Sequence, residues 1–393
     1  MKRTPPPKLL ATLFAASAVL IGIGSGCATK ETPRREVGSI PPGSFVKAWE
    51  VDVGLKKIEQ FHLGGETLLV YGGGNEVVAY DTKGGQKFRT LIGDKGDVID
   101  VPMVQAERII FPMSSTLEVV SHTGQKRPRI TLPSPLSSGG TAVEETVYAG
   151  TSSATGGRLT AIALDRDNPR FRREVLTRSI IDHPPVVHEN VVYAATTDGR
   201  VYAVNSDLTQ LWGIAPEMPD GIFRTDGKIE GGIKADEGGV YVPSTDGKLY
   251  CLDLNTGRIR WQYIAGVPLK ESPITTSDTV YIRVRGRGLV ALDKKAGPPF
   301  RQPRWTSDEA TQLLADDASH TYVLTKSGRI LALDKATGKV KFQSDRNDFV
   351  SGVTHVDAKD STIYVLTKGN DLLAVRPVLK TGVVGELALL EVR

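Results

Sequence analysis

Short apolar runs bounded by turn residues recur along most of the chain. Runs such as "TVYAG" (146–150), "VVYAA" (191–195) and "TIYVL" (362–366) have the length and the β-branched and aromatic content that are typical of strands. Glycine-containing turns follow them, for example "TDG" at 197–199 and again at 245–247. Glycine adopts positive φ at low cost, so these turns predict tight hairpins. The pattern therefore predicts an all-β fold.

The strand after each hairpin turn ends at a position that recurs with nearly constant spacing, as in "KLYCLDLNTGRIRW" (248–261) and "RILALDKATGKVKF" (329–342). The recurring positions are Asp81, Ser121, Asp165, Asn205, Asp253, Asp293, Asp334 and Arg376, at steps of 40, 44, 40, 48, 40, 41 and 42 residues. Eight units at this period predict an eight-bladed β-propeller with four-stranded antiparallel blades, extending over residues 44–393. The recurring carboxylates are expected to cap turns rather than to act in catalysis.

An aromatic residue follows the recurring position in six of the units: Phe88, Phe171, Trp212, Trp261, Trp305 and Phe342. Trp49, in "VKAWEVDV" (46–53), precedes the first unit in the same way. A large ring at the same place in successive blades is expected to pack between neighbouring blades. The strand that contains Trp49 is one candidate to complete the last blade and close the ring. The tail "VVGELALLEVR" (383–393) is the rival for that place.

The first 26 residues have the three parts of a secretory signal peptide: a basic start, an apolar run and small residues. The small residues lead directly into Cys27, and this junction resembles a bacterial lipobox. The resemblance implies that Cys27 receives lipid and becomes the mature N-terminus. The alternative is an ordinary cleaved signal in which Cys27 is incidental. Residues 27–43 are polar and contain proline, so they are expected to form a tether.

Charge and cysteine content argue against a nucleic-acid-binding protein and against a fold held together by disulfides. The 393-residue chain has a formal net charge of +4, and Lys2, Arg3 and Lys8 belong to the segment expected to be removed. The remainder lacks the clustered basic excess of a nucleic-acid-binding protein. With Cys27 lipidated, Cys251 has no disulfide partner, so we interpret it as a small buried hydrophobe on a strand.

The units that end in Asp, Thr-Gly and Trp resemble the repeat of quinoprotein-type propellers. The lipobox, the tether, Trp49 and the eight units together resemble the BamB family, which are lipoproteins of the bacterial outer-membrane β-barrel assembly machinery. This resemblance covers nearly the whole chain. It implies a non-catalytic scaffold, lipid-anchored at the periplasmic face of the outer membrane. Such a scaffold docks on the periplasmic domains of a BamA-like protein and assists unfolded outer-membrane protein clients.

The family resemblance also implies two docking loops. The loop that enters blade four is "VLTRSIIDHPP" (175–185), in which Leu176, Arg178 and Ile180 approximate the family's pattern. The second is "APEMPDGIFRTDGKIEGG" (215–232), expected between blades four and five, where the longest step of 48 residues falls. The family's acidic pair falls near Asp226 and Glu230.

Residue chemistry points to the second loop independently. Phe223 and Arg224 follow Met218 and Ile222 in a stretch with several turn residues. Apolar and arginine anchors in a loop are favoured at protein interfaces. The alternative is that these side chains fold back onto the propeller.

A second candidate surface is basic. "RVRGRG" (283–288) lies at a hairpin turn of unit six, and Lys326 and Lys368 occupy the matching turns of units seven and eight. Arg283, Arg285, Arg287, Lys326 and Lys368 are therefore expected to form a basic arc on one rim. Such an arc attracts an acidic partner surface or lipid headgroups, or is simply a solvated face.

No pattern in the chain indicates catalysis, a metal or a cofactor. The six histidines are scattered without zinc-like spacing, and "YGGGNE" (71–76) fits a hairpin turn because no helix follows it. The adjacent cysteines of quinone-dependent dehydrogenases do not occur. Two alternatives to the assembly scaffold stay open. One is a propeller lipoprotein of another envelope complex or a surface-polymer binder, and the other is a quinone-dependent dehydrogenase.

Overall fold

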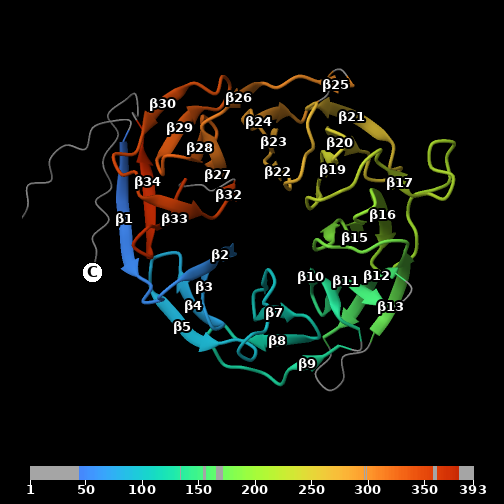
Figure 1. The fold of residues 1–393 in the computed structure, drawn as a ribbon, viewed down its shortest axis with the longest axis horizontal. Coiled ribbons are helices and arrows are strands. Elements are labelled where there is room, and N and C mark those ends of the chain that lie inside the picture. Colours follow the sequence, from blue (N-terminus) through green and yellow to red (C-terminus); the bar gives the residue numbers. More distant parts are fainter. Residues whose placement is uncertain are drawn as a thin grey trace, which may run out of the picture. The chain divides into compact units, whose positions relative to one another are not determined.

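The apolar runs form eight sheets that follow one another around a central axis (Figure 1). The computed structural model describes residues 44–379 except 133, 154–155, 165–170, 296, 298 and 357–360. The predicted signal peptide (1–26), the tether (27–43) with Cys27, and the tail at 383–393 lie outside the described residues. All regular elements of the described part are strands, and none of its segments is a helix that could span a bilayer.

The first four blades are each built from strands that are consecutive in the chain. Blade one contains β2 (Ile58–Gly64), β3 (Thr67–Gly72), β4 (Glu76–Asp81) and β5 (Gln86–Leu91). Blade two contains β6 (Met103–Val104), β7 (Ile109–Met113), β8 (Thr116–Val120) and β9 (Ile130–Thr131). Blade three contains β10 (Leu136–Val143), β11 (Thr146–Ser153), β12 (Gly156–Ala163) and β13 (Phe171–Thr177). Blade four contains β14 (Val186–His188), β15 (Val191–Ala195), β16 (Arg200–Asn205) and β17 (Phe223–Arg224).

The last four blades include two short additions to the four-stranded plan. Blade five contains β18 (Lys234–Asp236), β19 (Gly239–Pro243), β20 (Lys248–Leu252) and β21 (Ile259–Ile264), with β25 (Phe300–Arg301) added in parallel to β21. Blade six contains β22 (Ile274–Thr275), β23 (Thr279–Val284), β24 (Gly288–Asp293) and β26 (Trp305–Ser307). Blade seven contains β27 (Ala310–Asp316), β28 (His320–Thr325), β29 (Ile330–Asp334) and β30 (Val340–Gln343), with β32 (His355–Val356) added in parallel to β27. Blade eight contains β31 (Phe349–Gly352), β33 (Ile363–Thr367), β34 (Asp371–Val378) and β1 (Ser44–Asp52).

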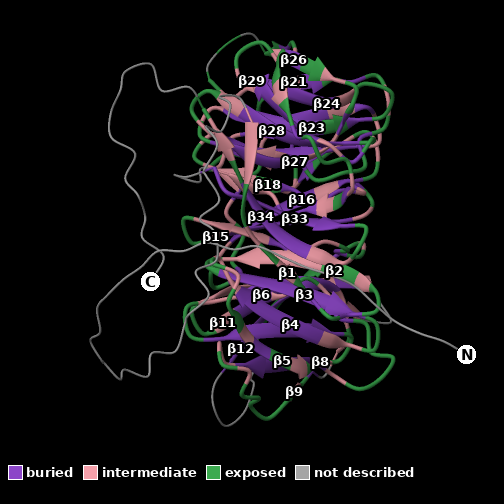
Figure 2. Cartoon of the chain, turned by 90° about the vertical axis from the view of Figure 1, so that its left-hand side faces the viewer, coloured by how far each residue is buried: buried purple, intermediate pink, exposed green. Residues whose placement is uncertain are grey.

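The core lies between neighbouring blades. All six residues of β3 are buried, because a blade is covered on both faces by its neighbours. One core cluster joins Val201 of blade four to Val240 and Tyr250 of blade five, and another joins Leu372 of blade eight to Val70 of blade one. Figure 2 shows the buried residues within the strands and the exposed residues mainly in the loops at their ends. Continuous apolar runs, rather than alternating ones, follow from this two-sided burial.

The recurring carboxylates cap turns, as predicted. Asp81 Oδ1 accepts hydrogen bonds from the backbone N–H groups of Lys83 and Gly85, each at 2.8 Å. Asp253 and Asp334 accept equivalent bonds from Thr256 and Thr337. Asp165 lies outside the described residues. The predicted glycine hairpins are also present, since Gly199, Gly247 and Gly328 all have positive φ.

The N-terminal strand closes the ring. β1 pairs with β34 along its length, from Ser44 opposite Val378 to Asp52 opposite Asp371. Glu50 on β1 also forms an ion pair with Arg346, with 3.0 Å between Oε1 of the glutamate and Nη1 of the arginine. Of the two candidates for this place, the strand that contains Trp49 is therefore the one that completes blade eight.

Candidate protein-docking site

Strand order places the candidate residues at one end of the propeller. In an antiparallel blade, the turn between the second and third strands lies at the same end as the connection to the next blade. We use the term loop face for the blade connections 178–185, 225–233 and 265–273 together with the turns 196–199 and 244–247. The remaining turns of blades four and five lie at the opposite end of the strands.

The first docking loop presents two apolar side chains and one cation to solvent. Leu176, at the end of β13, is 68% exposed, and Ile180 is 44% exposed. Arg178 between them is also exposed and forms no ion pair with a described residue. Ile181, which follows, is fully buried and fixes the loop to the blade. The structure thus exposes Leu176 at the end of β13, and Arg178 and Ile180 on the connection that follows it.

The second docking segment is divided by the fold in a way that the sequence did not indicate. Residues 213–222 do not connect blades four and five. They form an excursion within the outer edge of blade four, because Gln210 bridges Val204 before the excursion and Phe223 pairs with Val201 after it. The excursion leaves the ring beside β17 (Figure 1). The connection between blades four and five is only residues 225–233.

Phe223 is not an exposed anchor. It is 6% exposed and packs against Tyr250 of blade five with ring centroids 5.4 Å apart. Met218 is 1% exposed in the same core cluster. The stretch was expected either to expose these side chains to a partner or to fold them back onto the propeller, and the structure shows the second. Burial of two large apolar side chains at the blade boundary is more favourable than their exposure to water. Ile214, by contrast, is 81% exposed on the excursion, although the sequence did not single it out.

Arg224 fixes the excursion to the blade. Its Nη1 donates to Asp220 Oδ1 at 2.8 Å and its Nη2 donates to the other carboxylate oxygen. These bonds lower the pKa of Asp220 to about 2, so the pair is ionised at neutral pH. The Asp220 partner explains why Arg224, although exposed, is held in place.

The two predicted acidic residues lie on the loop face in separate ion pairs. Asp226 accepts from Lys248 of blade five at 2.8 Å, and Glu230 accepts from Lys270 at 2.7 Å. The Asp226 side chain is 79% exposed, so solvent screens its pair strongly. Buried Ile229, between the two acids, holds the loop to the core.

Hairpin turns join these loops into one continuous surface. Thr197 donates its backbone N–H to Ile180 O at 2.9 Å, and Thr225 donates to Gly199 O at 2.9 Å. The first turn therefore bridges the two loops that were predicted to dock. Thr245 N–H donates to Lys228 O at 2.8 Å and continues the surface to the next blade. The sequence identified these turns as hairpins but not as bridges, which depend on the contact between successive blades.

The predicted basic arc is only partly formed. Arg283, Arg285 and Lys326 line one pocket beside the turns of blades six and seven, at the same end of the propeller as the loop face. Arg287 turns away and donates to the Tyr263 hydroxyl at 3.3 Å. Lys368 is not among the lining residues of that pocket.

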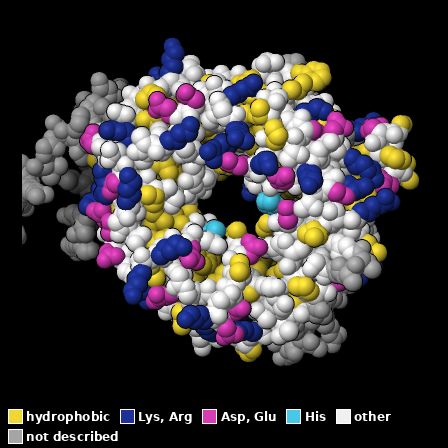
Figure 3. Space-filling view, viewed as in Figure 1, with side chains coloured by type: hydrophobic (Ala, Val, Ile, Leu, Met, Phe, Trp, Pro, Cys, Tyr) yellow, Lys and Arg dark blue, Asp and Glu magenta, His cyan; other side chains and the backbone are white. Residues whose placement is uncertain are grey.

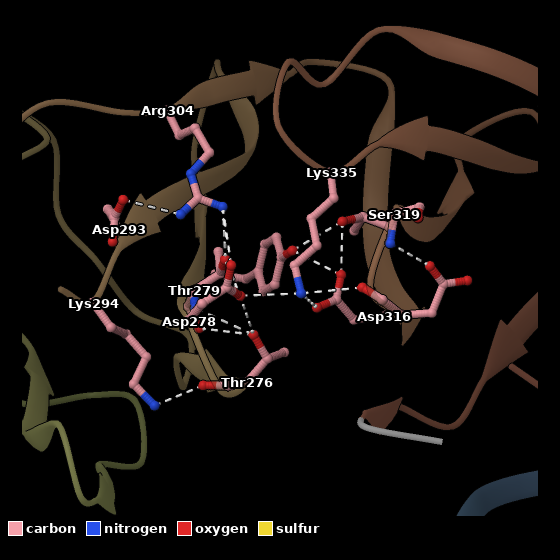
Figure 4. Close-up of polar contacts among 12 residues, drawn as sticks. Thr276, Asp278, Thr279, Asp293, Lys294, Arg304, Asp316, Ser319 and Lys335 are labelled. Atoms are coloured by element: carbon pink, nitrogen blue, oxygen red, sulfur yellow. Dashed lines mark hydrogen bonds and ion pairs between the residues drawn. The ribbon is translucent and has the colours of Figure 1, made fainter. Parts of the chain in front are cut away.

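A buried ionic network lies at the opposite end of blades six and seven (Figure 4). Asp316, 1% exposed, accepts hydrogen bonds from the Tyr281 hydroxyl at 2.9 Å and the Thr321 hydroxyl at 2.8 Å. Lys335 lies 2.7 Å from the other Asp316 oxygen and 3.0 Å from Asp278. Burial raises the pKa of Asp316, although the hydrogen bond with Lys335 opposes this shift. Its partners come from both blades, which indicates a structural role at their boundary.

The other reactive side chains also have structural roles. Burial raises the pKa of the Cys251 thiol to about 12, which confirms the interpretation of this residue as a buried hydrophobe on β20. No group of His, Cys, Asp and Glu within the described ranges has the arrangement of a metal site. Histidine side chains of the visible face border the central opening, and charged side chains are spread over that face (Figure 3).

Comparison with known proteins identifies the repeat. The sequence model of the family described as outer membrane protein assembly factor BamB matches residues 113–220 and 209–314, which together span 202 of the 393 residues. BamB of Escherichia coli is 34% identical over 80 residues, which are 20% of this chain and 20% of that protein. The crystal structure of BamB from Moraxella catarrhalis covers 84% of this chain and 97% of its own, with a TM-score of 0.62 and 13% identity, and supports the fold.

A quinoprotein enzyme shares part of the repeat as well. Quinohemoprotein alcohol dehydrogenase ADH IIB of Pseudomonas putida is 29% identical over 113 residues, which are 28% of this chain and 16% of the enzyme. The matched segments thus span a fifth or less of these two relatives. The match to the family model covers a longer part of this chain than either of these pairwise matches, and the eight-bladed fold agrees with it. The chain belongs to the family of the outer membrane protein assembly factor BamB.

Proposed function

We propose that this chain is a non-catalytic scaffold lipoprotein of the machinery that assembles β-barrel proteins in the outer membrane. Lipid on Cys27 anchors it at the periplasmic side of that membrane, and residues 27–43 tether the propeller. The loop face docks on the periplasmic domains of a BamA-like protein. Through this contact the scaffold assists folding and insertion of outer-membrane proteins.

The observation that carries the proposal is the exposed apolar pair of Leu176, at the end of β13, and Ile180, on the connection that follows and is hydrogen-bonded to the next blade. Exposed apolar side chains on a fixed backbone lose little conformational entropy when a partner covers them. Arg178 beside them has no described counter-ion and can pair with an acidic group of the partner. Asp226 extends the same surface with the opposite charge.

A catalytic alternative rests on the similarity to the alcohol dehydrogenase. The four tryptophans are all at blade boundaries, and Trp212, Trp261 and Trp305 are nearly fully buried there. They are therefore not available to stack on a cofactor at the propeller axis. The similarity to the enzyme is accounted for by the shared blade repeat, because blade packing alone requires these residues.

The proposal is tested by copurification from solubilised envelopes. The tagged lipidated protein is compared with a variant that carries Leu176→Asp and Ile180→Asp. Both positions are exposed, so the variant is expected to fold, and charge within the apolar contact is expected to reduce recovery of the barrel-assembly subunit at least about tenfold. Ile259→Asp with Val340→Asp is the matched control, since these side chains are 45% and 56% exposed on outer strands.

Recovery of the subunit with the wild type and the control, but not with the loop variant, supports the proposal. Absence of the subunit from every sample contradicts it and assigns the propeller to another envelope complex or polymer. Calcium-dependent dye reduction with added quinone by the same preparation would contradict the non-catalytic part.

A further inference from the structure

A pocket of about 530 Å³ opens on the loop side of blades six and seven. It lies where the connection 265–273, the β23–β24 turn and the β28–β29 turn meet. Its size is within the range of pockets that accept small ligands or a few side chains of a peptide. The charged lining residues are Lys270, Glu271, Arg283, Arg285, Asp308 and Lys326.

Two of the four cations in the pocket have no described counter-ion. Lys270 is paired with Glu230 at 2.7 Å, and Arg283 is paired with Glu271 at 2.8 Å. Arg285 and Lys326 form no ion pair with any described residue, although both contribute to the lining. Concentrated positive charge in a concave site attracts anions more strongly than the same charge on a flat surface.

Pro268 supplies exposed apolar surface to the pocket lining. Val284, at the end of β23, and Ala310, at the start of β27, also line the pocket, but each is only 1% exposed and mainly shapes it. A ligand that fills this pocket therefore combines an anionic group with an apolar group.

The lining favours a carboxylate over a phosphate. Asp308 also lines the pocket, and its carboxylate repels a dianion more strongly than a single carboxylate. The planar guanidinium of Arg285 matches a carboxylate with two parallel hydrogen bonds. A polypeptide supplies carboxylate and apolar side chains next to each other, which inorganic phosphate does not.

We propose that this pocket binds an acidic segment of polypeptide. An Asp or Glu side chain of the segment pairs with Arg285 and Lys326, and a neighbouring apolar side chain packs on Pro268. The site adjoins the loop face, because Lys270 of the pocket holds Glu230. It is a second binding site, and it does not depend on the identity of the partner that docks at Leu176.

The test uses a fluorescein-labelled peptide, Gly-Glu-Leu-Glu-Glu-Leu-Gly, titrated with the full-length protein and followed by fluorescence anisotropy. Arg285→Glu with Lys326→Glu is expected to weaken binding at least about tenfold, because two attractive contacts become repulsive. The matched control is Lys95→Glu with Lys368→Glu, which changes the net charge equally on exposed lysines outside the pocket. The control is expected to bind within about twofold of the wild type at moderate salt, where distant charges are screened.

Three outcomes overturn the proposal. An equal loss in both variants shows that only net charge matters. Equal affinity for the peptide with glutamine in place of glutamate shows that no carboxylate is recognised. Stronger binding to phosphatidylglycerol vesicles or to inorganic phosphate, lost in the pocket variant alone, assigns the pocket to phosphate instead. Thermal unfolding of each variant beforehand confirms that the propeller is intact.

Discussion

At three blade boundaries, one indole docks on the turn of the next blade in the same way. Trp49, Trp212 and Trp305 donate their Nε1–H to the carbonyl oxygen of the residue that follows the recurring aspartate, at 2.8–3.0 Å. The ring then covers a glycine of that turn, which is Gly84, Gly257 and Gly338 respectively. The glycines have positive φ and face the ring, so both the backbone and the space require them.

Gly257→Ala is expected to destabilise the propeller by about 2–4 kcal/mol, the sum of a left-handed backbone cost and an overpacked contact. A Cβ at this position would lie 2.6 Å from the indole of Trp212. Gly266→Ala is the matched control, because Gly266 has the same φ of 71° with nothing within 4 Å of a Cβ. Urea unfolding measures both; equal losses in the two variants would show that the docked indole contributes nothing.

Single residues on the second docking segment were the least predictable from sequence. Phe223 and Arg224 are adjacent, yet the first is buried and the second is exposed. Adjacent residues of a strand point to opposite faces of the sheet, so only one of these two side chains can face the core between blades four and five. The sequence could not show which, because the strand is only two residues long and its pairing with Val201 is set by the excursion before it.

At the scale of elements, neighbouring blades are also joined by buried charge. The network of Asp316, Lys335 and Asp278 connects β27 and the end of β29 to the β22–β23 turn. A buried ion pair contributes little net stability, but removal of one partner leaves an uncompensated charge. Replacement of Lys335 alone is therefore expected to cost much more stability than replacement of Lys335 and Asp316 together.

Lys335→Met is expected to destabilise the propeller by about 3 kcal/mol near pH 7, since Asp316 is left charged and almost inaccessible. The double variant with Asp316→Leu is expected to recover part of this loss. Lys57→Met is the control, because Lys57 and its partner Glu59 are 76% and 47% exposed. A double-mutant cycle by urea unfolding measures the coupling, and additive effects would contradict the network.

The same variant is expected to be pH-dependent. Burial already raises the pKa of Asp316 above 3.8, and loss of Lys335 raises it further. When a carboxyl group has a higher pKa in the folded state than in the unfolded state, the free energy of unfolding falls as pH rises toward the folded-state pKa. The deficit of Lys335→Met is therefore smaller at about pH 4.5 than at about pH 7.5, where the unpaired carboxylate is ionised. A deficit that is constant over this range would show that Asp316 does not titrate there.

At the scale of the whole molecule, repetition made the fold predictable. Eight recurring positions indicated eight blades, and the caps at Asp81, Asp253 and Asp334 have the predicted form. Contacts between blades were less predictable, because the pairing of Thr197 with Ile180 or of Lys270 with Glu230 depends on geometry that the repeat alone does not encode. The choice of the Trp49 strand to close the ring also required the structure, since both ends of the chain contain strand-like sequence.

Ring closure and the loop face together define what this molecule offers to a partner. Closure through β1 completes blade eight, and the loops and the outer strands are then the parts that a partner can reach. The loops of blades four and five are fixed by hydrogen bonds between blades, and they present Leu176, Arg178 and Ile180 without reorganisation. A pre-organised surface of this kind is expected to bind its partner as it stands.

Site-specific photocrosslinking in intact cells can locate the docking surface. A photoreactive amino acid replaces Ile180 on the loop face or, separately, Ile259 on the outer strand β21. Position 180 is expected to give an adduct with the barrel-assembly subunit, and position 259 is expected to give none. Absence of an adduct at position 180, or equal adducts from both positions, would contradict the assignment of the loop face as the docking site.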